Sequence, residues 1–327
     1  MAKLVTIYGG SGFVGRYVAQ KLAAKGWRVR VAVRRPNEAL FVKPYGVPGQ
    51  VEPVLCNIRD DASVTAVMKG ADAVVNCVGT FDARGRNSFT AVQAQGAERI
   101  ARAAAAEGVQ TLVHVSALGV DRDQDSLYAE SKRKGEEAIL AAFPSATILR
   151  PSVVFGPEDG FFNRFASMSR LGPVLPIFGG RTRFQPVYVE DVAEAAVMGA
   201  EGKAKGIYEL GGPEVKSLRG WIDVMLTSVR RWRLVPNLPF WIGRIMAFGL
   251  DMVEILTLGL IKNRLLTRDQ LKQLQHDNVV SEDARGFTDL GIEPVAVEVV
   301  IDSYLWRFRP NGQFDAIRDS AKNLRTH

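Results

Sequence analysis

The sequence predicts an α/β protein built on a doubly wound parallel sheet, with a smaller, mostly helical C-terminal region. Three observations support this prediction. Short apolar runs alternate with helical segments through the first half of the 327 residues, a glycine-rich turn follows the first run, and the alternation stops after Gly156. Strands that alternate with helices are joined by right-handed crossovers, so they form a parallel sheet with helices on both faces.

The expected strands of the first half are short apolar runs that end at glycine or at polar residues. They cover residues 4–8, 27–33, 51–56, 72–78, 110–115 and 146–153. The helices between them are expected at residues 13–24, 63–69, 89–107 and 127–142, and most of these stop at a glycine or a proline.

After Gly156 the pattern is less regular, and the expected elements are more varied. An alanine-rich helix capped by Asp191 is expected to follow a short strand. The full set is a helix at 161–171, strands at 185–189 and 206–210, mostly helical structure at 218–274, a turn at 288–294 and a last helix at 295–308.

The change of pattern also predicts two domains. The first covers residues 1–156, with later segments near 185–200 and 206–210 returning to it. The second, at 157–327, is smaller, mixed or helical, and is expected to face a partner or a membrane.

The composition is that of an ordinary globular protein, with 47% hydrophobic and 24% charged residues. Two cysteines and three scattered histidines exclude a disulfide framework and predict no metal site. Cys56 and Cys77 are expected to be small buried hydrophobic residues. We see no signal peptide and no run of about 18 apolar residues, so we expect neither a targeting peptide nor a transmembrane helix.

The glycine-rich turn between the first strand and the first helix is the strongest chemical signal. Glycine is needed where the chain turns tightly, where backbone approaches a pyrophosphate, and where a helix packs on a strand. The helix N-terminus then offers free N–H groups and the positive end of its dipole to phosphates. The position of this turn favours a Rossmann-type dinucleotide site over a plain packing turn. The binding residues are expected to be Gly9, Ser11, Gly12, Phe13, Val14 and Gly15.

The end of the second strand indicates which dinucleotide binds. NAD sites usually carry an acid there, which accepts hydrogen bonds from the ribose hydroxyls, whereas this chain has Arg34 and Arg35. A guanidinium is permanently charged and presents a planar fork of donors that suits a 2′-phosphate. The sequence therefore favours NADPH (or NADP+) over NAD(H), with Arg34 better placed than Arg35. The alternative is two solvated arginines on a loop.

Two further strand ends are candidates for cofactor contact. At the end of the third strand, Asn57 is placed to hydrogen-bond adenine and Ile58 to pack on its ring, with an ordinary strand-ending turn as the alternative. At the end of the fourth strand, Cys77, Val78 and Gly79 are small enough for backbone to pass close to the cofactor.

Together with the glycine turn, Ser116 at the end of the fifth strand and Tyr128 followed by Lys132 resemble the extended and atypical short-chain dehydrogenase/reductase family. The resemblance implies that Tyr128 is the general acid or base. It also implies that Lys132, one helical turn on, lowers the pKa of that tyrosine and binds the nicotinamide ribose. Where the family usually has a catalytic Ser or Thr, this chain has Leu118, which cannot donate a hydrogen bond. Tyr128 and Lys132 are therefore read as vestigial or ribose-binding, and catalysis is left open.

A narrower resemblance runs through nearly the whole chain. Residues 149–159 and 185–192, together with 265–270 and 289–292, resemble the family of NADPH-binding accessory subunits of respiratory complex I, in its bacterial form. The resemblance implies a nucleotide held for stability, with Pro151 and Val154 among its contacts. It also implies the other subunits of complex I as partners, and a peripheral location on the cytoplasmic face of a bacterial inner membrane.

Two other functions remain open at this point. One is a free NADP-dependent reductase or nucleotide-sugar epimerase that uses Tyr128 and Lys132. The other is an assembly or quinone-biosynthesis factor on the same membrane.

Residues 216–275 carry ten basic and four acidic residues, and so hold most of the net charge of +7. Residues 230–233, Arg-Arg-Trp-Arg, form a basic and aromatic patch suited to anionic headgroups or an acidic subunit. The apolar stretch 241–261 is read as domain core or as a helix laid on a membrane or partner. Nucleic acid is not expected, because no binding motif accompanies the charge.

Overall fold

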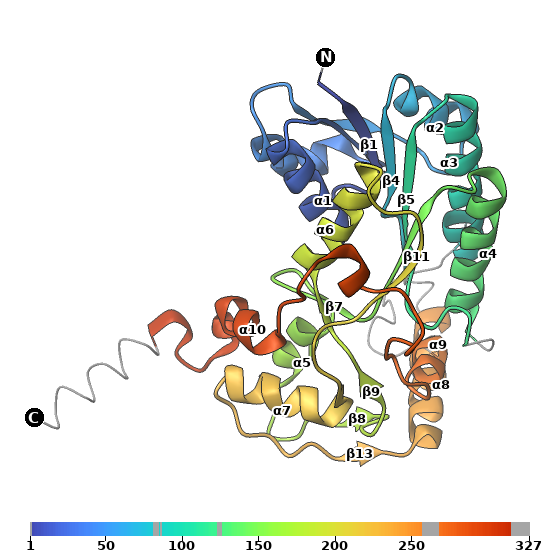
Figure 1. The fold of residues 1–327 in the computed structure, drawn as a ribbon. Helices are drawn as coiled ribbons and strands as arrows, with labels where there is room; N and C mark the ends of the chain where they lie inside the picture. The colour runs from blue at the N-terminus through green and yellow to red at the C-terminus, as the bar shows by residue number, and fades with distance from the viewer. Residues whose placement is uncertain (1, 81–84, 86, 123–125, 257–267, 315–327) are drawn as a thin grey trace, which may run out of the picture. The chain divides into compact units, whose positions relative to one another are not determined.

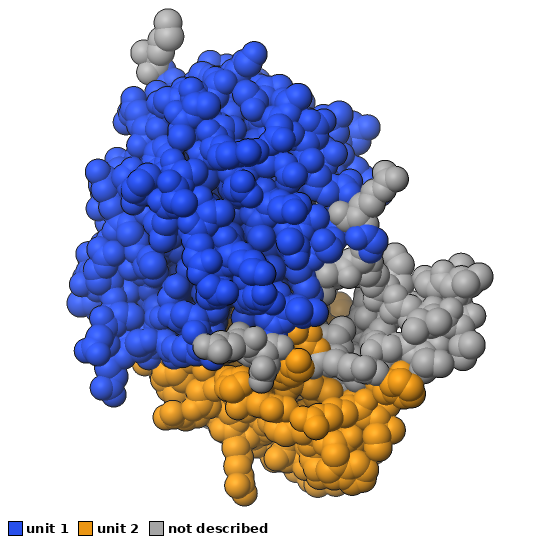
Figure 2. All heavy atoms as spheres, turned by 90° about the vertical axis from the view of Figure 1, so that its right-hand side faces the viewer, with its two compact units in different colours: residues 1–152, 189–211, 280–294 blue, residues 153–188, 212–279, 295–327 orange. Residues whose placement is uncertain are grey.

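The computed structural model describes residues 2–80, 85, 87–122, 126–256 and 268–314. The chain divides into two compact units (Figure 2). Unit 1 comprises residues 1–152, 189–211 and 280–294, and unit 2 comprises residues 153–188, 212–279 and 295–327. Each unit is therefore interrupted in sequence and completed by segments from later in the chain.

Unit 1 is built on one sheet of seven parallel strands, in the order β11-β6-β5-β4-β1-β2-β3 (Figure 1). The register sets Val5 beside Val29 on one side and Ala73 on the other. The strands are β1 (Leu4–Tyr8), β2 (Arg28–Val33), β3 (Val51–Leu55), β4 (Ala73–Asn76), β5 (Thr111–Val115), β6 (Thr147–Pro151) and β11 (Gly206–Leu210). The doubly wound parallel sheet predicted from the sequence is confirmed.

Helices cover both faces of this sheet, also as predicted. In Figure 1, α1 and α6 lie on one face, and α2, α3 and α4 lie on the other. Their bounds are α1 (Phe13–Ala24), α2 (Asp61–Met68), α3 (Gln95–Ala106), α4 (Leu127–Ala142) and α6 (Val189–Ala200). Two short helices, η1 (Pro36–Tyr45, a 3₁₀-helix) and η2 (Thr90–Ala94, a π-helix), complete this unit's first half, and η3 (Thr288–Leu290) is a later 3₁₀ turn.

Several element boundaries differ from the prediction. Asp191 does not cap its helix, because α6 begins two residues earlier at Val189 and Asp191 is buried in its first turn. The helix expected at 63–69 begins at Asp61, since the Asp60 carboxylate accepts hydrogen bonds from the N–H groups of residues 62 and 63. The short helix η1 was not predicted, and Pro44 lies inside it.

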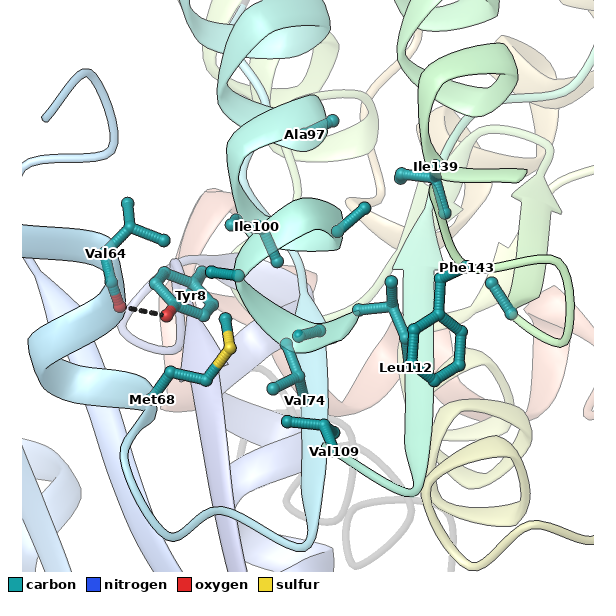
Figure 3. Close-up of a cluster of buried hydrophobic side chains, with 14 of the residues drawn as sticks. Tyr8, Val64, Met68, Val74, Ala97, Ile100, Val109, Leu112, Ile139 and Phe143 are labelled. Atoms are coloured by element: carbon teal, nitrogen blue, oxygen red, sulfur yellow. Dashed lines mark hydrogen bonds between the residues drawn. The ribbon is translucent and has the colours of Figure 1, made fainter. Parts of the chain in front are cut away.

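The core on one face of the sheet is a cluster of buried side chains from β1, β4, β5, α2, α3 and α4 (Figure 3). Ile100, Leu112 and Ile139 are fully buried in it. The hydroxyl is the one polar group of the Tyr8 side chain, and it donates a hydrogen bond to the Val64 carbonyl oxygen at 2.7 Å. Burial raises the pKa of this phenol well above its ordinary value, so Tyr8 is a structural residue that stays protonated.

Unit 2 consists of short paired strands and helices around a second core. Trp221 is fully buried there, and its indole N–H donates to the Phe184 carbonyl oxygen at 3.0 Å. The strands are β7 (Val154–Phe155), β8 (Ile177–Phe178), β9 (Arg183–Phe184), β10 (Val187–Tyr188), β12 (Lys216–Ser217) and β13 (Asn237–Leu238). They pair as β10 with β7, β12 with β9, and β13 with β8.

The helices of unit 2 only partly match the expected pattern. They are α5 (Phe162–Met168), α7 (Leu218–Ser228), α8 (Phe240–Leu256), α9 (Arg268–Gln273) and α10 (Val297–Leu305), with 3₁₀ turns η4 (Trp306–Phe308) and η5 (Gly312–Phe314). The expected helical run at 218–274 is interrupted by a loop and β13, and residues 257–267 lie outside the described residues. The strand expected at 185–189 is shorter, as β10.

Asp159, at the end of the segment 149–159, has a structural role in unit 2. Its buried carboxylate accepts hydrogen bonds from the backbone N–H groups of Gly156 (3.2 Å), Phe161 (3.0 Å) and Asn163 (3.0 Å). It also accepts one from the Tyr304 hydroxyl of α10 at 2.8 Å. A buried acceptor that satisfies this many donors anchors the loop after β7 to the last helix.

Helix α8 has one packed face and one exposed face. A Cβ added at Gly243 would lie 3.0 Å from both Phe178 and Leu271, so this face packs closely against β8 and α9. Trp241, Ile245 and Phe248 are exposed. No helix in the described part of the chain is long and apolar enough to cross a bilayer.

Candidate nucleotide-binding site

The glycine turn joins β1 to α1 with the geometry that a phosphate site needs. Gly9 has a left-handed φ of +74°, and the Gly12 N–H donates to its carbonyl oxygen at 2.9 Å. A Cβ added at Gly15 would lie 2.4 Å from that same oxygen, so only glycine lets α1 pack this closely. No side chain caps α1, and its first turn holds no acidic residue. Its N-terminal N–H groups are therefore available to an anion.

The two arginines after β2 differ in their surroundings. The Arg35 guanidinium lies 2.9 Å from the Glu38 carboxylate, and both side chains are largely exposed. Arg34 is exposed, and no ion pair with it is found among the described residues. Arg34 is therefore the more accessible of the two cations, and its contact with a 2′-phosphate stays a prediction.

Arg16, in the first turn of α1, was not among the residues predicted from the sequence. Its Nη2 donates to the Ser11 carbonyl oxygen at 3.3 Å, and its guanidinium lies 4.8 Å from the centre of the Phe41 ring in η1. It therefore brings a second cation to the glycine turn. A basic residue directly after the last glycine was the signal that could have identified it.

The residues after β3 lie in different environments. Asn57 is exposed, and its Oδ1 accepts a hydrogen bond from the Arg59 N–H at 3.2 Å. Ile58 is buried in the core cluster, and a Cβ added at Gly96 of α3 would meet its side chain at 3.0 Å. The structure leaves Asn57 accessible, while the adenine contacts of both residues stay predictions.

Lys132 brings the ends of three elements of unit 1 together. Its side chain is buried, and its ammonium donates to the Val115 carbonyl oxygen at the end of β5 at 2.9 Å. A Cβ added at Gly79, after β4, would lie 3.6 Å from the same ammonium. Burial raises the pKa of the nearby Cys77 thiol to about 12, and the charge of Lys132 partly offsets this. Cys56 is buried as expected, whereas Cys77 as a whole is only partly buried.

Two buried polar groups near Lys132 lack hydrogen-bond partners among the described residues: the Ser116 hydroxyl and both ring nitrogens of His114. Burial, and then the charge of Lys132, lower the pKa of His114 well below its ordinary value, so this imidazole is neutral. Because buried hydroxyls are almost always satisfied, the unpartnered Ser116 Oγ is an observation that fits a nucleotide at this site.

The remaining predicted residues complete the description. Tyr128 is partly exposed at the start of α4, and its ring lies 6.0 Å from that of Phe89. Leu118 is buried, so it presents no polar group to a substrate. Pro151 is buried in β6 of unit 1, whereas Val154 lies in β7 of unit 2 and is described only within that unit. Within the described ranges no group of His, Cys, Asp or Glu side chains is arranged to hold a metal ion.

The buried ammonium of Lys132 is expected to make the stability of the fold depend on pH. Burial lowers its pKa to about 8, from an ordinary value of 10.5, while Glu136 and Cys77 oppose this shift. Because the depressed value means that the folded state binds fewer protons than the unfolded state, stability should rise as pH increases from about 8 towards 10.5. Lys132→Met should remove a rise of roughly 3 kcal/mol. The difference in urea-unfolding free energy between wild type and variant measures this.

The matched control is Lys134→Met on the same helix. Lys134 is exposed and pairs with Glu130, so its removal should leave the pH profile unchanged. A Lys132→Met profile parallel to that of the wild type would contradict the burial argument.

The sheet order, the glycine turn and the buried lysine define an α/β protein of the Rossmann type with a candidate nucleotide site. The model of the NAD dependent epimerase/dehydratase family matches residues 5–211, and the chain belongs to this family. It is 35% identical over 316 residues to the mitochondrial NADH dehydrogenase (ubiquinone) 1 alpha subcomplex subunit 9 of Arabidopsis thaliana, covering 94% of this chain and 79% of that protein. The predicted membership of the short-chain dehydrogenase/reductase family, with complex I subunits among the relatives, is thus confirmed.

Two other similarities bear on function and fold. The chain is 34% identical over 237 residues to the ceramide reductase of Caulobacter vibrioides, covering 71% of this chain and 73% of that protein. Among solved structures, the enzyme WbmH of Bordetella bronchiseptica, in complex with NAD+, superposes with a TM-score of 0.69 at 17% identity, covering 95% of this chain and 100% of that one. At this identity the likeness to WbmH supports the fold alone.

Proposed function

We propose that this chain is an NADPH-binding accessory subunit of a proton-pumping NADH:ubiquinone oxidoreductase. The observation that carries the proposal is the similarity to the Arabidopsis subunit, which extends over 94% of the chain and so covers both units. Residues 1–156, with their later returns, bind the nucleotide, and residues 157–327 face partner subunits. The chain is peripheral, on the cytoplasmic face of a bacterial inner membrane.

The nucleotide is held for stability rather than for turnover. The turn at residues 9–15 binds the pyrophosphate, Arg34 binds the 2′-phosphate, and Ser116 and Lys132 bind the nicotinamide ribose. A buried Leu118 supports this view, because a leucine cannot polarise a substrate carbonyl. Bound NADPH stabilises the folded state, by about 2.7 kcal/mol when the free NADPH concentration is a hundred times its dissociation constant.

The experiment that tests the subunit role is extraction of native membranes in mild detergent, followed by a native gel probed for this chain. Co-migration with NADH dehydrogenase activity at a fixed stoichiometry is the expected result. Transient or substoichiometric association would instead indicate an assembly or quinone-biosynthesis factor. A chain that runs alone in the soluble fraction would overturn the proposal.

Arg34→Asp tests the preference for NADPH. The substitution removes the unpaired cation and places a carboxylate beside the 2′-phosphate, so NADPH affinity should fall by roughly a hundredfold while NADH affinity changes little. Isothermal titration with both nucleotides measures this. Arg35→Asp is the matched control and should have a much smaller effect, because Arg35 already pairs with Glu38. Equal loss of both nucleotides in Arg34→Asp would contradict the role of the 2′-phosphate.

A second function is favoured by one observation, the similarity to a ceramide reductase together with the presence of Tyr128 and Lys132. In this function the chain is a free NADP-dependent reductase or epimerase, with Tyr128 as general acid or base. NADPH oxidation with a long-chain carbonyl substrate, abolished by Tyr128→Phe, would establish turnover and rule out the purely structural role.

A further inference from the structure

Unit 2 carries an exposed cluster of apolar and cationic side chains, which we call the arginine–tryptophan patch. It consists of Arg170, Leu171, Arg231, Trp232, Arg233 and Leu234. Leu171, Trp232 and Leu234 are 88%, 79% and 56% exposed. Large apolar side chains exposed to this degree and gathered together mark an interaction surface.

The patch is held rigidly by two chain segments that run side by side. The Leu175 N–H donates to the Leu234 carbonyl oxygen at 2.8 Å, and the Leu234 N–H donates to the Pro173 carbonyl oxygen at 2.9 Å. Leu175 and Val235 are buried beneath these bonds, while Leu234 and Val174 point outwards. The apolar side chains are therefore presented by a fixed backbone, anchored on the core of unit 2.

Two arginines of the patch donate hydrogen bonds to backbone carbonyl oxygens. The Arg231 Nε donates to the Phe308 carbonyl oxygen at 2.9 Å, and the Arg233 Nε donates to the Ser169 carbonyl oxygen at 2.6 Å. Burial, and then the nearby Arg233 and Arg170, lower the pKa of the Arg231 guanidinium. In the described part of the chain, no carboxylate pairs with any of these three arginines, so the patch is complementary to an anionic surface.

A strained backbone position lies next to the patch. Arg230, which follows the C-cap residue of α7, has a left-handed φ of +55°, and no other non-glycine residue among those described has a positive φ. A non-glycine residue in the left-handed region is strained, and glycine would avoid this strain at such a helix end. An arginine at this position is therefore retained at a cost in stability.

We propose that the arginine–tryptophan patch docks unit 2 on the surface of a bilayer that contains anionic lipids. Arginines bind the headgroup phosphates while Trp232 and the two leucines enter the boundary between headgroups and acyl chains. All six side chains are either apolar or guanidinium, and none is a neutral polar group. Tryptophan with neighbouring arginines is typical of segments at the membrane–water interface, so we commit to a lipid surface as the occupant. This proposal rests on the proposed function and assigns its membrane contact to particular residues.

The test is sedimentation of the purified full-length chain with vesicles. Phosphatidylethanolamine vesicles with about a third phosphatidylglycerol should bind the chain at least tenfold better than vesicles of phosphatidylcholine alone, and high salt should reduce binding. Trp232→Ser and Arg170→Glu should each lower partition onto the anionic vesicles by roughly tenfold. Leu171→Ser offers a second apolar test from a separate segment of the chain.

Two control variants lie in unit 1 and match these changes. Val47→Ser removes a similarly exposed apolar side chain, and Arg28→Glu makes the same change in net charge as Arg170→Glu. Both should leave partition within about twofold of the wild type, as expected if binding is local to the patch.

Three outcomes would overturn the proposal. They are a wild-type chain that does not sediment with anionic vesicles, patch variants that bind as well as the wild type, and equal binding to phosphatidylcholine. If the patch variants dissociate from the native complex while the wild type does not bind vesicles, the patch binds an acidic protein instead of lipid. The vesicle assay contains no other subunit, so it tests this inference separately from the proposed function. If the wild type co-migrates with NADH dehydrogenase but does not bind vesicles, the proposed function stands and only this inference is rejected.

Discussion

Gly15→Ala is expected to lower the affinity of the chain for NADPH by roughly a hundredfold or more. The added Cβ would lie 2.4 Å from the Gly9 carbonyl oxygen and 2.8 Å from the Gly10 Cα. Both contacts are with backbone, which has no rotamer to change, so α1 must move away from the turn. A shift of this helix displaces the N–H groups that face the pyrophosphate, and overpacking itself costs about 1–3 kcal/mol or more. Isothermal titration of NADPH measures the effect, and thermal unfolding measures the loss of stability.

Gly249→Ala is the matched control, because it also replaces a glycine inside a helix. A Cβ at Gly249 in α8 would meet no atom within 4 Å. Alanine is a better helix former than glycine by about 1 kcal/mol, so this variant should be as stable as the wild type or slightly more stable. Unchanged NADPH affinity in Gly15→Ala would show that the turn is only a packing feature.

Arg150→Met is expected to destabilise the chain by about 3–5 kcal/mol. The Arg150 Nε donates to both carboxylate oxygens of Glu136 at 3.1 Å, and its Nη2 donates to Glu136 Oε2 at 2.7 Å. Its Nη1 donates to Asp121 at 2.7 Å. The Glu136 side chain is only 4% exposed, so removal of the arginine leaves a buried carboxylate without its main partner. Urea unfolding of wild type and variant gives the difference in free energy.

Two comparisons show whether burial is the cause. Arg133→Met removes an exposed ion pair with Glu137 on the same helix, and it should cost less than about 1 kcal/mol. The double variant Arg150→Met with Glu136→Leu removes both buried charges and should recover most of the lost stability. A double variant that is less stable than Arg150→Met alone would contradict this account.

Most of unit 1 was predictable from local sequence. β1, α1, α4 and β11 have the predicted bounds, because apolar runs of strand length, or of helical period, stop just before a glycine or a proline. Unit 2 was harder to predict. Its strands have two residues each and are defined by pairing with partners far away in sequence, such as β13 with β8. Two residues carry no periodicity, so no local pattern could reveal these strands.

The candidate site divides in a similar way. The glycine turn and Arg34 follow from residue type and position, since only glycine accepts the backbone geometry and only an unpaired cation suits a 2′-phosphate. Arg16 was missed, because its proximity to the turn depends on the path of its side chain. Ile58 was predicted to pack on an adenine ring, and its side chain is buried against Gly96 of a different element.

The sequence by itself determined the parallel sheet, the position of the glycine turn and the family. These features depend on residue types at short spacings, because backbone preferences are set by residues close together in the chain. Only the tertiary structure decided that Lys132 and Gly79 lie together, that Arg150 pairs with Glu136, and that Arg170 lies near Arg231. These features require segments that are distant in the chain to come into contact. Which charges are buried and paired depends on that contact, so no single segment determines it.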